Sequence, residues 1–323
     1  LIGDQHQLAS VETGLVLAQL AQHRAFTPEG AQLLAAMGCA VPSDFVESRS
    51  PRHPTADAVV WLERNYRFAR DSAIGQLARA IVADRPDDVL ASLADDDASA
   101  TRGDPRDLDA LCDAALDAWQ PFIDAVRDNA APRDVLAAFE RHRVLAALRH
   151  GPHGTHGLNA RLSTRLRALL HPRTSHEWYA GRPILVVRND AALGVFNGDV
   201  GVALNDAEGR MLVHFPTVDG TRAIAPERLP ACTDAFALTV HKAQGSEYRS
   251  VDIVLPLRDT PLITRELLYT AVTRARERLS LWADDDTLLR ALARPTRRYS
   301  GLSDRLGDLG NRDGNLHGRA LAG

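Results

Sequence analysis

The sequence predicts an α/β protein whose mainly parallel sheet is interrupted by a small β insertion. Two observations lead to this fold class. After residue 143, short apolar runs suited to buried strands alternate with segments of helical periodicity, as in strand–helix–strand units. Between residues 198 and 230 the apolar runs lie close together and are bounded by turn residues such as Asn197-Gly198, which is typical of antiparallel hairpins.

The N-terminal third is predicted to be mostly helical. Three short helices are expected, over residues 11–22, 28–37 and 71–83. Thr27 is a suitable cap for the second of them. A turn-rich linker is expected at residues 49–54, and a loop around the aspartate run at 95–97. A longer helical region follows over residues 107–129, with the helix-breaking Pro121 inside it.

Strands and helices alternate in the rest of the chain. Strands of the mainly parallel sheet are expected at residues 144–148, 184–187, 236–240, 251–255 and 279–283. Helices are expected at residues 158–170 and 264–276, and the strands of the insertion at 200–204 and 211–215. The tail after residue 294 is rich in Gly, Arg and Asp, and we expect it to be poorly ordered.

Composition limits the class of protein. A chain of 323 residues suggests about two domains, and 45% hydrophobic with 25% charged residues excludes wholesale disorder. No apolar run approaches the roughly 18 residues of a membrane helix, and the first residues lack the features of a signal peptide. The three cysteines have no paired spacing, so we expect neither disulfides nor a cysteine metal site, and a cytoplasmic location.

Lysine is nearly absent from the chain. Lys242 is the single lysine among 38 basic residues. A P-loop requires the pattern G-x-x-x-x-G-K-[S/T]. Lys242 follows His241 and precedes Ala243, so the chain contains no P-loop. Because the sequence opens without Met and is expected to begin inside a strand, we expect it to be a piece of a longer protein.

Charge is unevenly distributed although the net charge is only −4. Residues 84–113 hold ten aspartates and three arginines, whereas residues 127–178 hold nine arginines and four acidic residues. One interpretation is a solvated acidic loop followed by a basic helical surface. The other places the basic stretch near phosphates or near the acidic surface of a partner.

Four segments carry the functional prediction. They are residues 3–12 (GDQHQLASVE), 65–68 (NYRF), 239–248 (TVHKAQGSEY) and 268–276 (LYTAVTRAR). In this order they resemble motifs III, IV, V and VI of superfamily 1 helicases. Two further stretches resemble the RecD branch of that superfamily. These are residues 139–152 followed by Gly157-Leu158-Asn159, and residues 188–190 leading to 196–199.

The resemblance implies a division into motor domains. Residues 1–55 would be the C-terminal remnant of a first RecA-like domain, and residues 56–197 with 231–294 a second RecA-like domain with a parallel sheet. Residues 198–230 would form an SH3-like β insertion, and residues 295–323 a disordered tail. The magnesium-binding motif II would lie upstream of Leu1.

The resemblance also implies roles for single residues. Gln7, Arg67 and Arg274 match catalytic positions. A glutamine such as Gln7 can hydrogen-bond the γ-phosphate or its attacking water, and the guanidinium group of an arginine can form two hydrogen bonds with phosphate oxygens. Gly245 and Glu247 match nucleotide-binding positions, and Thr239 and His241 match positions that contact the DNA backbone.

Each of these residues also has an ordinary structural interpretation. Gln7 could be a capping residue, Arg67 a partner in a surface salt bridge, and His241 a buried structural histidine. Arg274 could belong to a solvated basic face with its neighbouring arginines. The Gly/His stretch at residues 150–156 has no accompanying carboxylate or cysteine, so no metal site is expected there.

The implied function is the C-terminal part of an ATP-dependent 5′-to-3′ DNA helicase subunit of a RecBCD-type nuclease-helicase, acting in double-strand break repair and recombination. The implied cofactors are ATP and Mg²⁺, with their main ligands upstream, and the implied partners are single-stranded DNA and RecB-like and RecC-like subunits. Without a P-loop this chain is expected to be inactive alone. The alternatives are a stand-alone RecD-type or relaxase-linked helicase fragment, or a non-catalytic remnant that binds DNA or docks to a subunit.

Overall fold

The computed structural model describes residues 2–8, 16–21, 23–47, 53–61, 72–94, 99–173, 176–296, 301–302 and 305–306. The chain divides into two compact units, one made of residues 1–66 with 296–323 and the other of residues 67–295. The first unit therefore extends past residue 55, where the sequence predicts the end of the first motor domain. Among the described residues, no helix has the length and apolar character needed to cross a bilayer.

The first unit is a small, mostly helical body. It holds α1 (Val16–Leu20), α2 (Pro28–Ala36) and the 3-10 helix η1 (Ser43–Phe45). Thr27 caps α2 as predicted, because its hydroxyl oxygen accepts the backbone N–H of Gly30 at 3.0 Å. Asp57 in turn accepts hydrogen bonds from the backbone and the hydroxyl of Thr27, at 2.8 and 2.7 Å. Of the helix predicted over residues 11–22, only residues 16–21 are described. The rest of that prediction lies outside the described residues.

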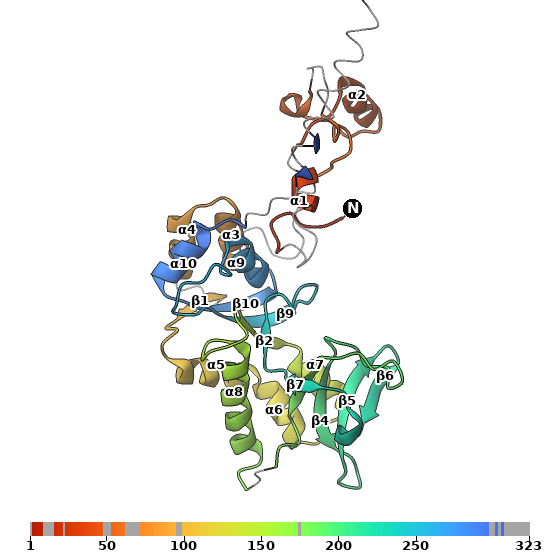
Figure 1. Ribbon diagram of the computed structural model, residues 1–323, viewed down its shortest axis with the longest axis vertical. Helices are drawn as coiled ribbons and strands as arrows, with labels where there is room; N and C mark the ends of the chain where they lie inside the picture. The colour runs from red at the N-terminus through yellow and green to blue at the C-terminus, as the bar shows by residue number, and fades with distance from the viewer. Residues whose placement is uncertain are drawn as a thin grey trace, which may run out of the picture. The chain divides into compact units, whose positions relative to one another are not determined.

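A five-stranded parallel sheet forms the centre of the second unit (Figure 1). Its order is β1-β10-β9-β2-β8, and the strands are β1 (Ala100–Gly103), β2 (His142–Ala146), β8 (Ala237–Thr239), β9 (Tyr248–Val254) and β10 (Ala275–Trp282). In the register, Val144 of β2 pairs with Ala237 on one side and with Asp252 on the other. Every neighbouring pair is parallel, which confirms the predicted α/β class and matches a RecA-like motor domain.

Helices cover both faces of this sheet. One group lies above it in Figure 1, namely α3 (Ala73–Val82), α4 (Pro86–Ala94), α9 (Arg265–Val272) and α10 (Asp285–Leu292). The other group lies below it, namely α5 (Leu108–Ala118), α6 (Gln120–Arg127) and α8 (Thr155–Leu170). α3 shows how the sequence selects this arrangement, since Ile74, Leu77 and Ile81 recur at helical spacing and are all buried.

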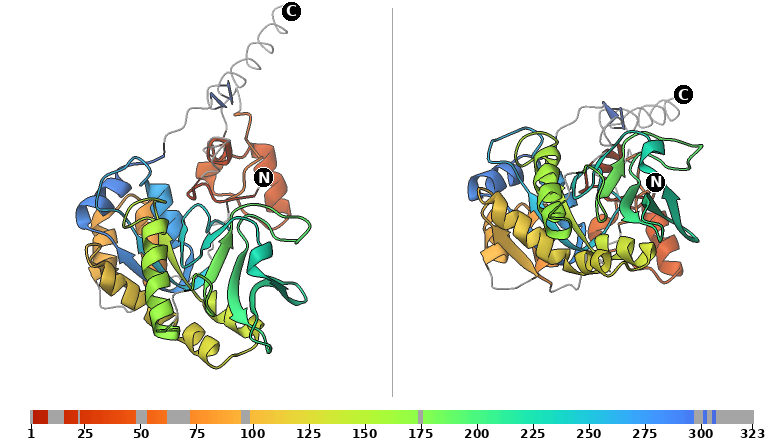
Figure 2. Two further views of the ribbon diagram at one scale, coloured as in Figure 1. Left: turned by 60° about the horizontal axis from the view of Figure 1, so that its bottom comes forward. Right: turned by 90° about the horizontal axis from the view of Figure 1, so that it is seen from below.

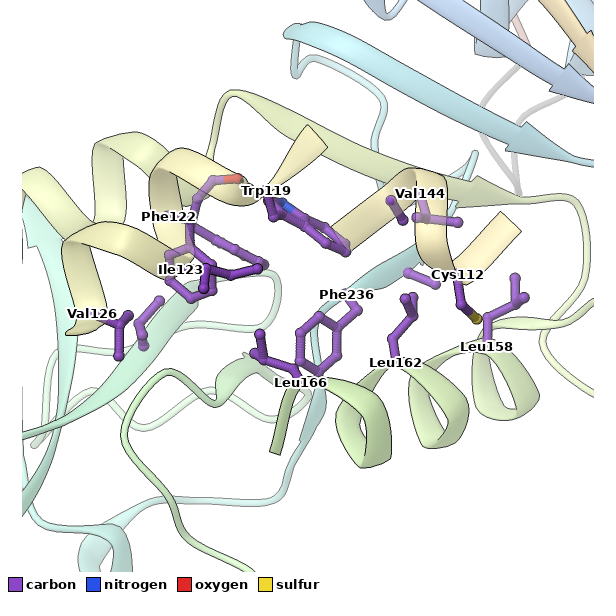
Figure 3. Close-up of a cluster of buried hydrophobic side chains, with 14 of the residues drawn as sticks. Cys112, Trp119, Phe122, Ile123, Val126, Val144, Leu158, Leu162, Leu166 and Phe236 are labelled. Carbon is purple, nitrogen blue, oxygen red and sulfur yellow. Dashed lines mark hydrogen bonds between the residues drawn. The ribbon is translucent and has the colours of Figure 1, made fainter. Parts of the chain in front are cut away.

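An aromatic cluster fills the space below the sheet (Figure 3). The indole of Trp119 stacks on Phe139 with ring centroids 5.5 Å apart, and Phe236 meets it edge-on at 5.6 Å. The indole N–H is buried, and it donates to the carbonyls of Phe139 and His142 at 3.3 and 3.2 Å. Trp119 stands where α5 ends and α6 begins, because Pro121 fits only the first turn of a helix and so divides the long helix that the periodicity suggests.

The second sheet corrects one predicted strand. Five antiparallel strands pair in the order β6-β5-β4-β3-β7, with bounds β3 (Pro183–Val186), β4 (Val200–Asn205), β5 (Met211–Thr217), β6 (Gly220–Ile224) and β7 (Cys232–Asp234). The prediction that residues 184–187 belong to the motor sheet is wrong, because β3 pairs antiparallel with β4 and β7. A short apolar run cannot show which sheet it joins. The antiparallel sheet is thus wider than residues 198–230, and Figure 2 shows it beside the parallel sheet.

The antiparallel sheet shares its core with the motor sheet. Val202 and Leu204 of β4 belong to the aromatic cluster, whereas Ala203 between them belongs to a second core on the opposite face. This alternation follows from the two-residue period of a strand. The helix α7 (Pro132–Phe139) packs against β4, β5 and β6. The insertion is therefore built into the second unit.

The acidic stretch at residues 84–113 is largely ordered. It contains α4, the edge strand β1 and the start of α5, so the interpretation as one solvated loop is wrong. Several of its carboxylates pair with arginines, including Asp109 with Arg165 at 2.6 Å. The aspartate run at 95–97 and the loop predicted there lie outside the described residues.

Tyr179 provides a test of how tightly the second unit is packed. Its phenol is buried, lies 2.9 Å from the hydroxyl of Ser163 and donates to the Ser163 carbonyl at 3.2 Å. Burial raises the pKa of Tyr179 from 10.0 to about 12. The stabilisation from the protonated phenol is thus complete below pH 10 and is lost as pH rises toward 12.

We therefore expect the free energy of unfolding to fall by roughly 3 kcal/mol more in the wild type than in Tyr179→Phe over this window. Urea unfolding of both proteins below pH 10 and near pH 12 measures the difference. Parallel pH profiles for the two proteins would contradict the buried phenol.

Candidate functional site

The candidate residues of the second unit lie at two opposite edges of the parallel sheet. Thr239 ends β8 at the carboxyl edge, and Tyr248 begins β9 at the amino edge. Because β8 and β9 are both parallel to β2, residues 240–247 must cross from one edge to the other. We call these residues the crossing segment. At about 3.3 Å per residue, the length of β9 places the two edges roughly 20 Å apart.

A cavity of about 380 Å³ lies at the carboxyl edge. It is lined by the end of β8, by the start of α8 and by residues of β3 and β7. Thr239 lines it, and its hydroxyl oxygen accepts the backbone N–H of Lys242 at 3.3 Å. His241 follows in the crossing segment and is half-buried. Of the two predicted DNA-contact residues, Thr239 therefore lines the cavity, and His241 follows it two residues later in the chain.

Two buried polar side chains fix the position of β8. β8 is an edge strand, and the carboxamide of Asn159 completes its free side by donating to the Ala237 carbonyl at 3.0 Å and accepting the Ala237 N–H at 2.7 Å. The buried guanidinium of Arg143 donates to the Ala235 carbonyl at 2.6 Å and lies 4.3 Å from the Phe139 ring. Burial lowers the pKa of Arg143. Sequence reasoning gave neither residue a role, since such bonds depend on a neighbouring strand.

Arg274 lies at the amino edge and is almost completely buried, with 2% of its surface exposed. Its guanidinium donates to the carbonyl of Thr270 at 2.9 Å, to the carbonyl of Ser246 at 3.0 Å and to the hydroxyl of Thr273 at 3.3 Å. The alternative that placed Arg274 on a solvated basic face is therefore wrong. Arg274 joins the end of α9 to the end of the crossing segment.

Glu247 and Gly245 also belong to this edge. The carboxylate of Glu247 forms an ion pair with Arg276 at 2.8 Å. Gly245 is exposed and has φ +86°, a backbone conformation that side-chain-bearing residues rarely adopt. Apart from Gly245 and its two chain neighbours, no heavy atom of the described residues lies within 4 Å of a Cβ built on Gly245, so the turn itself requires the glycine.

The remaining two candidates are Gln7 and Arg67. Gln7 belongs to the first unit, in a turn over residues 5–7 where its amide donates to Asp4 at 3.0 Å. Residues 2–8 form no strand, so the expectation that the chain begins inside one is not met in this described stretch. Arg67 lies outside the described residues, and so does the motif around it.

The Gly/His stretch serves the fold. His153 is buried and shares a 2.7 Å hydrogen bond with the Pro105 carbonyl, which anchors the loop after β2. His150 and His156 meet edge-on at 4.7 Å. Within the described part of the chain, no three His, Cys, Asp or Glu residues are grouped as metal ligands would be.

Comparisons with known proteins place these features in a helicase context. Residues 234–282 match the family described as the UvrD-like helicase C-terminal domain. The chain is 34% identical to the RecBCD enzyme subunit RecD of Haemophilus influenzae, over 96% of this chain and 50% of that protein. It is 35% identical to the RecBCD enzyme subunit RecD of Mycobacterium tuberculosis, over 96% of this chain and 49% of that protein.

Among solved structures, the Pif1 helicase from Bacteroides in complex with ADP-AlF3 and ssDNA is similar with a TM-score of 0.41 and 14% identity. That match covers 76% of this chain and 56% of the Pif1 chain. The chain spans about half the length of the curated relatives it matches.

The contacts of Arg274 predict a large effect on stability. Replacing it by methionine keeps much of the buried volume but leaves the carbonyls of Thr270 and Ser246 without these donors. We expect the free energy of unfolding to fall by about 2–4 kcal/mol, since an unsatisfied buried polar group costs about 1–3 kcal/mol. Urea unfolding measures this change. The matched control is Arg278→Met at an exposed position of β10, where the change should stay within about 0.5 kcal/mol. Equal stability of the two variants would contradict a structural role for Arg274.

Proposed function

We propose, on the premise that this chain belongs to the RecD-like superfamily 1 helicases, that it supplies the second RecA-like motor domain of an ATP-dependent 5′-to-3′ DNA helicase subunit. In this proposal one edge of the motor sheet contacts single-stranded DNA and the opposite edge takes part in ATP hydrolysis. The subunit would work with RecB-like and RecC-like partners in the repair of double-strand breaks. The names of the relatives support this assignment, since both are RecBCD enzyme subunits.

One observation carries the proposal, namely that the crossing segment joins the candidate residues at the carboxyl edge of the sheet to those at the amino edge. Thr239 immediately precedes this segment and His241 lies near its start. Gly245, Ser246 and Glu247 lie at its end beside Arg274. A displacement at the amino edge can therefore reach the carboxyl edge through eight residues of backbone. Such a direct connection suits a motor, which must link the state of its nucleotide to its grip on DNA.

The carboxyl edge suits contact with a DNA backbone. Hydroxyl and imidazole groups such as those of Thr239 and His241 can donate hydrogen bonds to phosphate oxygens, and contacts of this kind hold a strand without reading its sequence. The cavity edge also presents the side chains of Arg149 and Lys242. Positive charge at this position favours a polyanion.

The amino edge suits part of a nucleotide site. The Glu247 carboxylate could accept a ribose hydroxyl, and the charge of Arg274 could offset charge on the γ-phosphate, because guanidinium groups stabilise phosphoryl transfer. ATP with Mg²⁺, when bound, would supply the hydrolysis that drives movement. Gln7 and Arg67 are assigned here to the same reaction from their motifs. The P-loop and the carboxylate ligands of Mg²⁺ would come from upstream sequence, so this chain alone would be inactive.

The proposal predicts a specific kinetic defect in the full-length parent protein. Arg67→Ala should lower kcat for DNA-stimulated ATP hydrolysis by about 10³-fold or more, because arginines that neutralise the γ-phosphate act mainly in the transition state. Nucleotide binding should change far less. Steady-state ATPase assays and equilibrium binding of a fluorescent nucleotide measure the two effects. Arg278→Ala is the control, and near-wild-type turnover in Arg67→Ala would remove that residue from the catalytic set.

A second prediction concerns this chain by itself. It should bind labelled oligothymidylate but should not hydrolyse ATP, because a P-loop lysine is absent from its sequence. Fluorescence anisotropy and a phosphate-release assay measure the two activities. Lack of binding at low salt would contradict the DNA-contacting role, and DNA-stimulated ATP hydrolysis would contradict the inactivity proposed for the chain.

A further inference from the structure

Arg143 is a buried charge whose hydrogen bonds are incomplete. It lies on β2 with 2% of its surface exposed. Among the residues that the structure describes, its Nε–H has no hydrogen-bond partner. A buried charge that is not fully paired costs stability, and a well-packed apolar side chain of similar volume is often the more stable choice. The stability of the core therefore does not explain why an arginine occupies this position.

The guanidinium of Arg143 contacts three separate parts of the chain. It donates to the carbonyl of Ala235, in the link between β7 and β8, at 2.6 Å. It lies 4.3 Å from the ring of Phe139 at the end of α7 and 5.2 Å from the ring of Tyr248 at the start of β9. The attraction between a cation and an aromatic ring is strongest where both are removed from water. Arg143 thus joins the link between the two sheets to the start of β9.

Ala235 lies where the chain passes from the antiparallel sheet to the parallel sheet. Its N–H donates to the Pro183 carbonyl of β3 at 3.0 Å, so it is bonded to the antiparallel sheet. Its carbonyl accepts from Arg143 on the parallel sheet. Asp234, the residue before it, is the last of β7 and pairs with Arg182 at 2.8 Å. A shift of β7 along β3 would therefore move the acceptor that Arg143 holds.

Tyr248 is the residue through which Arg143 reaches the amino edge. Its side chain is buried, and its backbone N–H donates to the carbonyl of Arg274 at 2.8 Å. Two residues earlier, the Ser246 carbonyl accepts from the guanidinium of Arg274. Among the described residues, Arg143 and Arg274 are the only arginines that are buried. Both of them contact residues 246–248, which contain Glu247.

We infer that Arg143 is a positioning residue that couples the antiparallel sheet to the amino edge of the parallel sheet, with Tyr248 as its contact at that edge. The inference rests on the proposed function, in which Arg274 and Glu247 take part in ATP hydrolysis. It gives the position of the antiparallel sheet a way to regulate that reaction. A small movement suffices, because a displacement of about 1 Å at a catalytic group can reduce a rate about 100-fold.

Fluorine NMR of this chain tests the coupling directly. The chain has five tyrosines, so 3-fluorotyrosine gives five signals, and the signal lost in Tyr248→Phe belongs to that residue. Asp234→Asn weakens the ion pair with Arg182 next to Ala235. This substitution should shift the Tyr248 signal in the otherwise unchanged chain. The shift should be lost when Arg143 is replaced by methionine, because the connection is then broken.

Tyr179 is the internal control for this measurement. Its phenol interacts electrostatically with Asp234 and Arg182, so Asp234→Asn should shift its signal whether or not Arg143 is present. That shift also shows that each variant is folded around the ion pair. If the methionine variant does not fold, Arg143→Lys takes its place. Lysine keeps the charge but lacks the planar fork that holds several partners at once, so the Tyr248 shift should again be reduced.

Asp259→Asn is the matched substitution at a distant ion pair. It removes the charge of a carboxylate that pairs with Arg294 at 2.9 Å, and it should leave the Tyr248 signal where it is. After Asp234→Asn, an equal shift of the Tyr248 signal with and without Arg143 would overturn the inference. The absence of any shift in the chain that retains Arg143 would overturn it as well.

The kinetics of the full-length parent protein test the consequence for ATP hydrolysis. Arg143→Lys should lower kcat for DNA-stimulated hydrolysis by about tenfold to a hundredfold, with a far smaller change in KM for ATP. Expressing kcat per nucleotide-binding site removes the effect of any unfolded protein. Tyr248→Leu should act similarly, and the double variant should be no slower than either single one, because both break the same contact. Arg133→Lys, at an exposed position of α7, is the control and should leave kcat unchanged.

The outcomes separate this inference from the proposed function. If the parent protein shows no DNA-stimulated ATP hydrolysis, the proposed function is wrong, and the fluorine signals alone decide whether Arg143 couples the two sheets. If the parent is active and Arg143→Lys has the kcat of the wild type, the regulatory coupling is wrong while the proposed function stands. Additive losses in Arg143→Lys and Tyr248→Leu would likewise contradict a shared contact.

Discussion

The arrangement of the second unit depends on one topological constraint. β8 and β9 are parallel but not adjacent, with β2 between them, so the chain must return from the carboxyl edge to the amino edge in the crossing segment. Antiparallel strands would have allowed a tight turn, whereas parallel strands require a crossover. The crossing segment consequently has one end in the cavity wall and the other end bonded to Arg274. The candidate residues at the two edges of the sheet are therefore connected because its strands are parallel.

The sequence was a good guide where chemistry is local. The periodicity of α3 and the buried run of β9 predicted their elements, since both depend on which face of the segment is apolar. Thr27 predicted the start of α2, because capping is a contact within a few residues. The motif in the crossing segment was found through a resemblance, and its glycine does occupy the backbone conformation that only glycine adopts readily.

Long-range pairing could not be predicted in this way. β3 has the composition of a buried motor strand, and only its partners β4 and β7 show that it belongs to the antiparallel sheet. The arginines close to Arg274 in sequence left a solvated basic face as the alternative to its predicted catalytic role, but its guanidinium turns inward to carbonyls 4 and 28 residues away. Asn159 gave no signal of its own, since its carboxamide pairs with a strand 78 residues later.

Buried polar contacts at the middle of the sheet indicate which part of the unit can move. Asp252 of β9 accepts from the indole of Trp282 at 3.2 Å and lies 3.3 Å from the imidazole of His142, so β2, β9 and β10 are joined by side chains as well as by backbone. Deforming the sheet would break contacts between buried polar side chains, which is costly in an interior of low dielectric constant. The crossing segment, by contrast, has only Val240 and Ala243 buried, and its other residues are half-buried or exposed and include a glycine turn. A change at Arg274 would therefore reach the cavity through the crossing segment, with the sheet as the fixed frame.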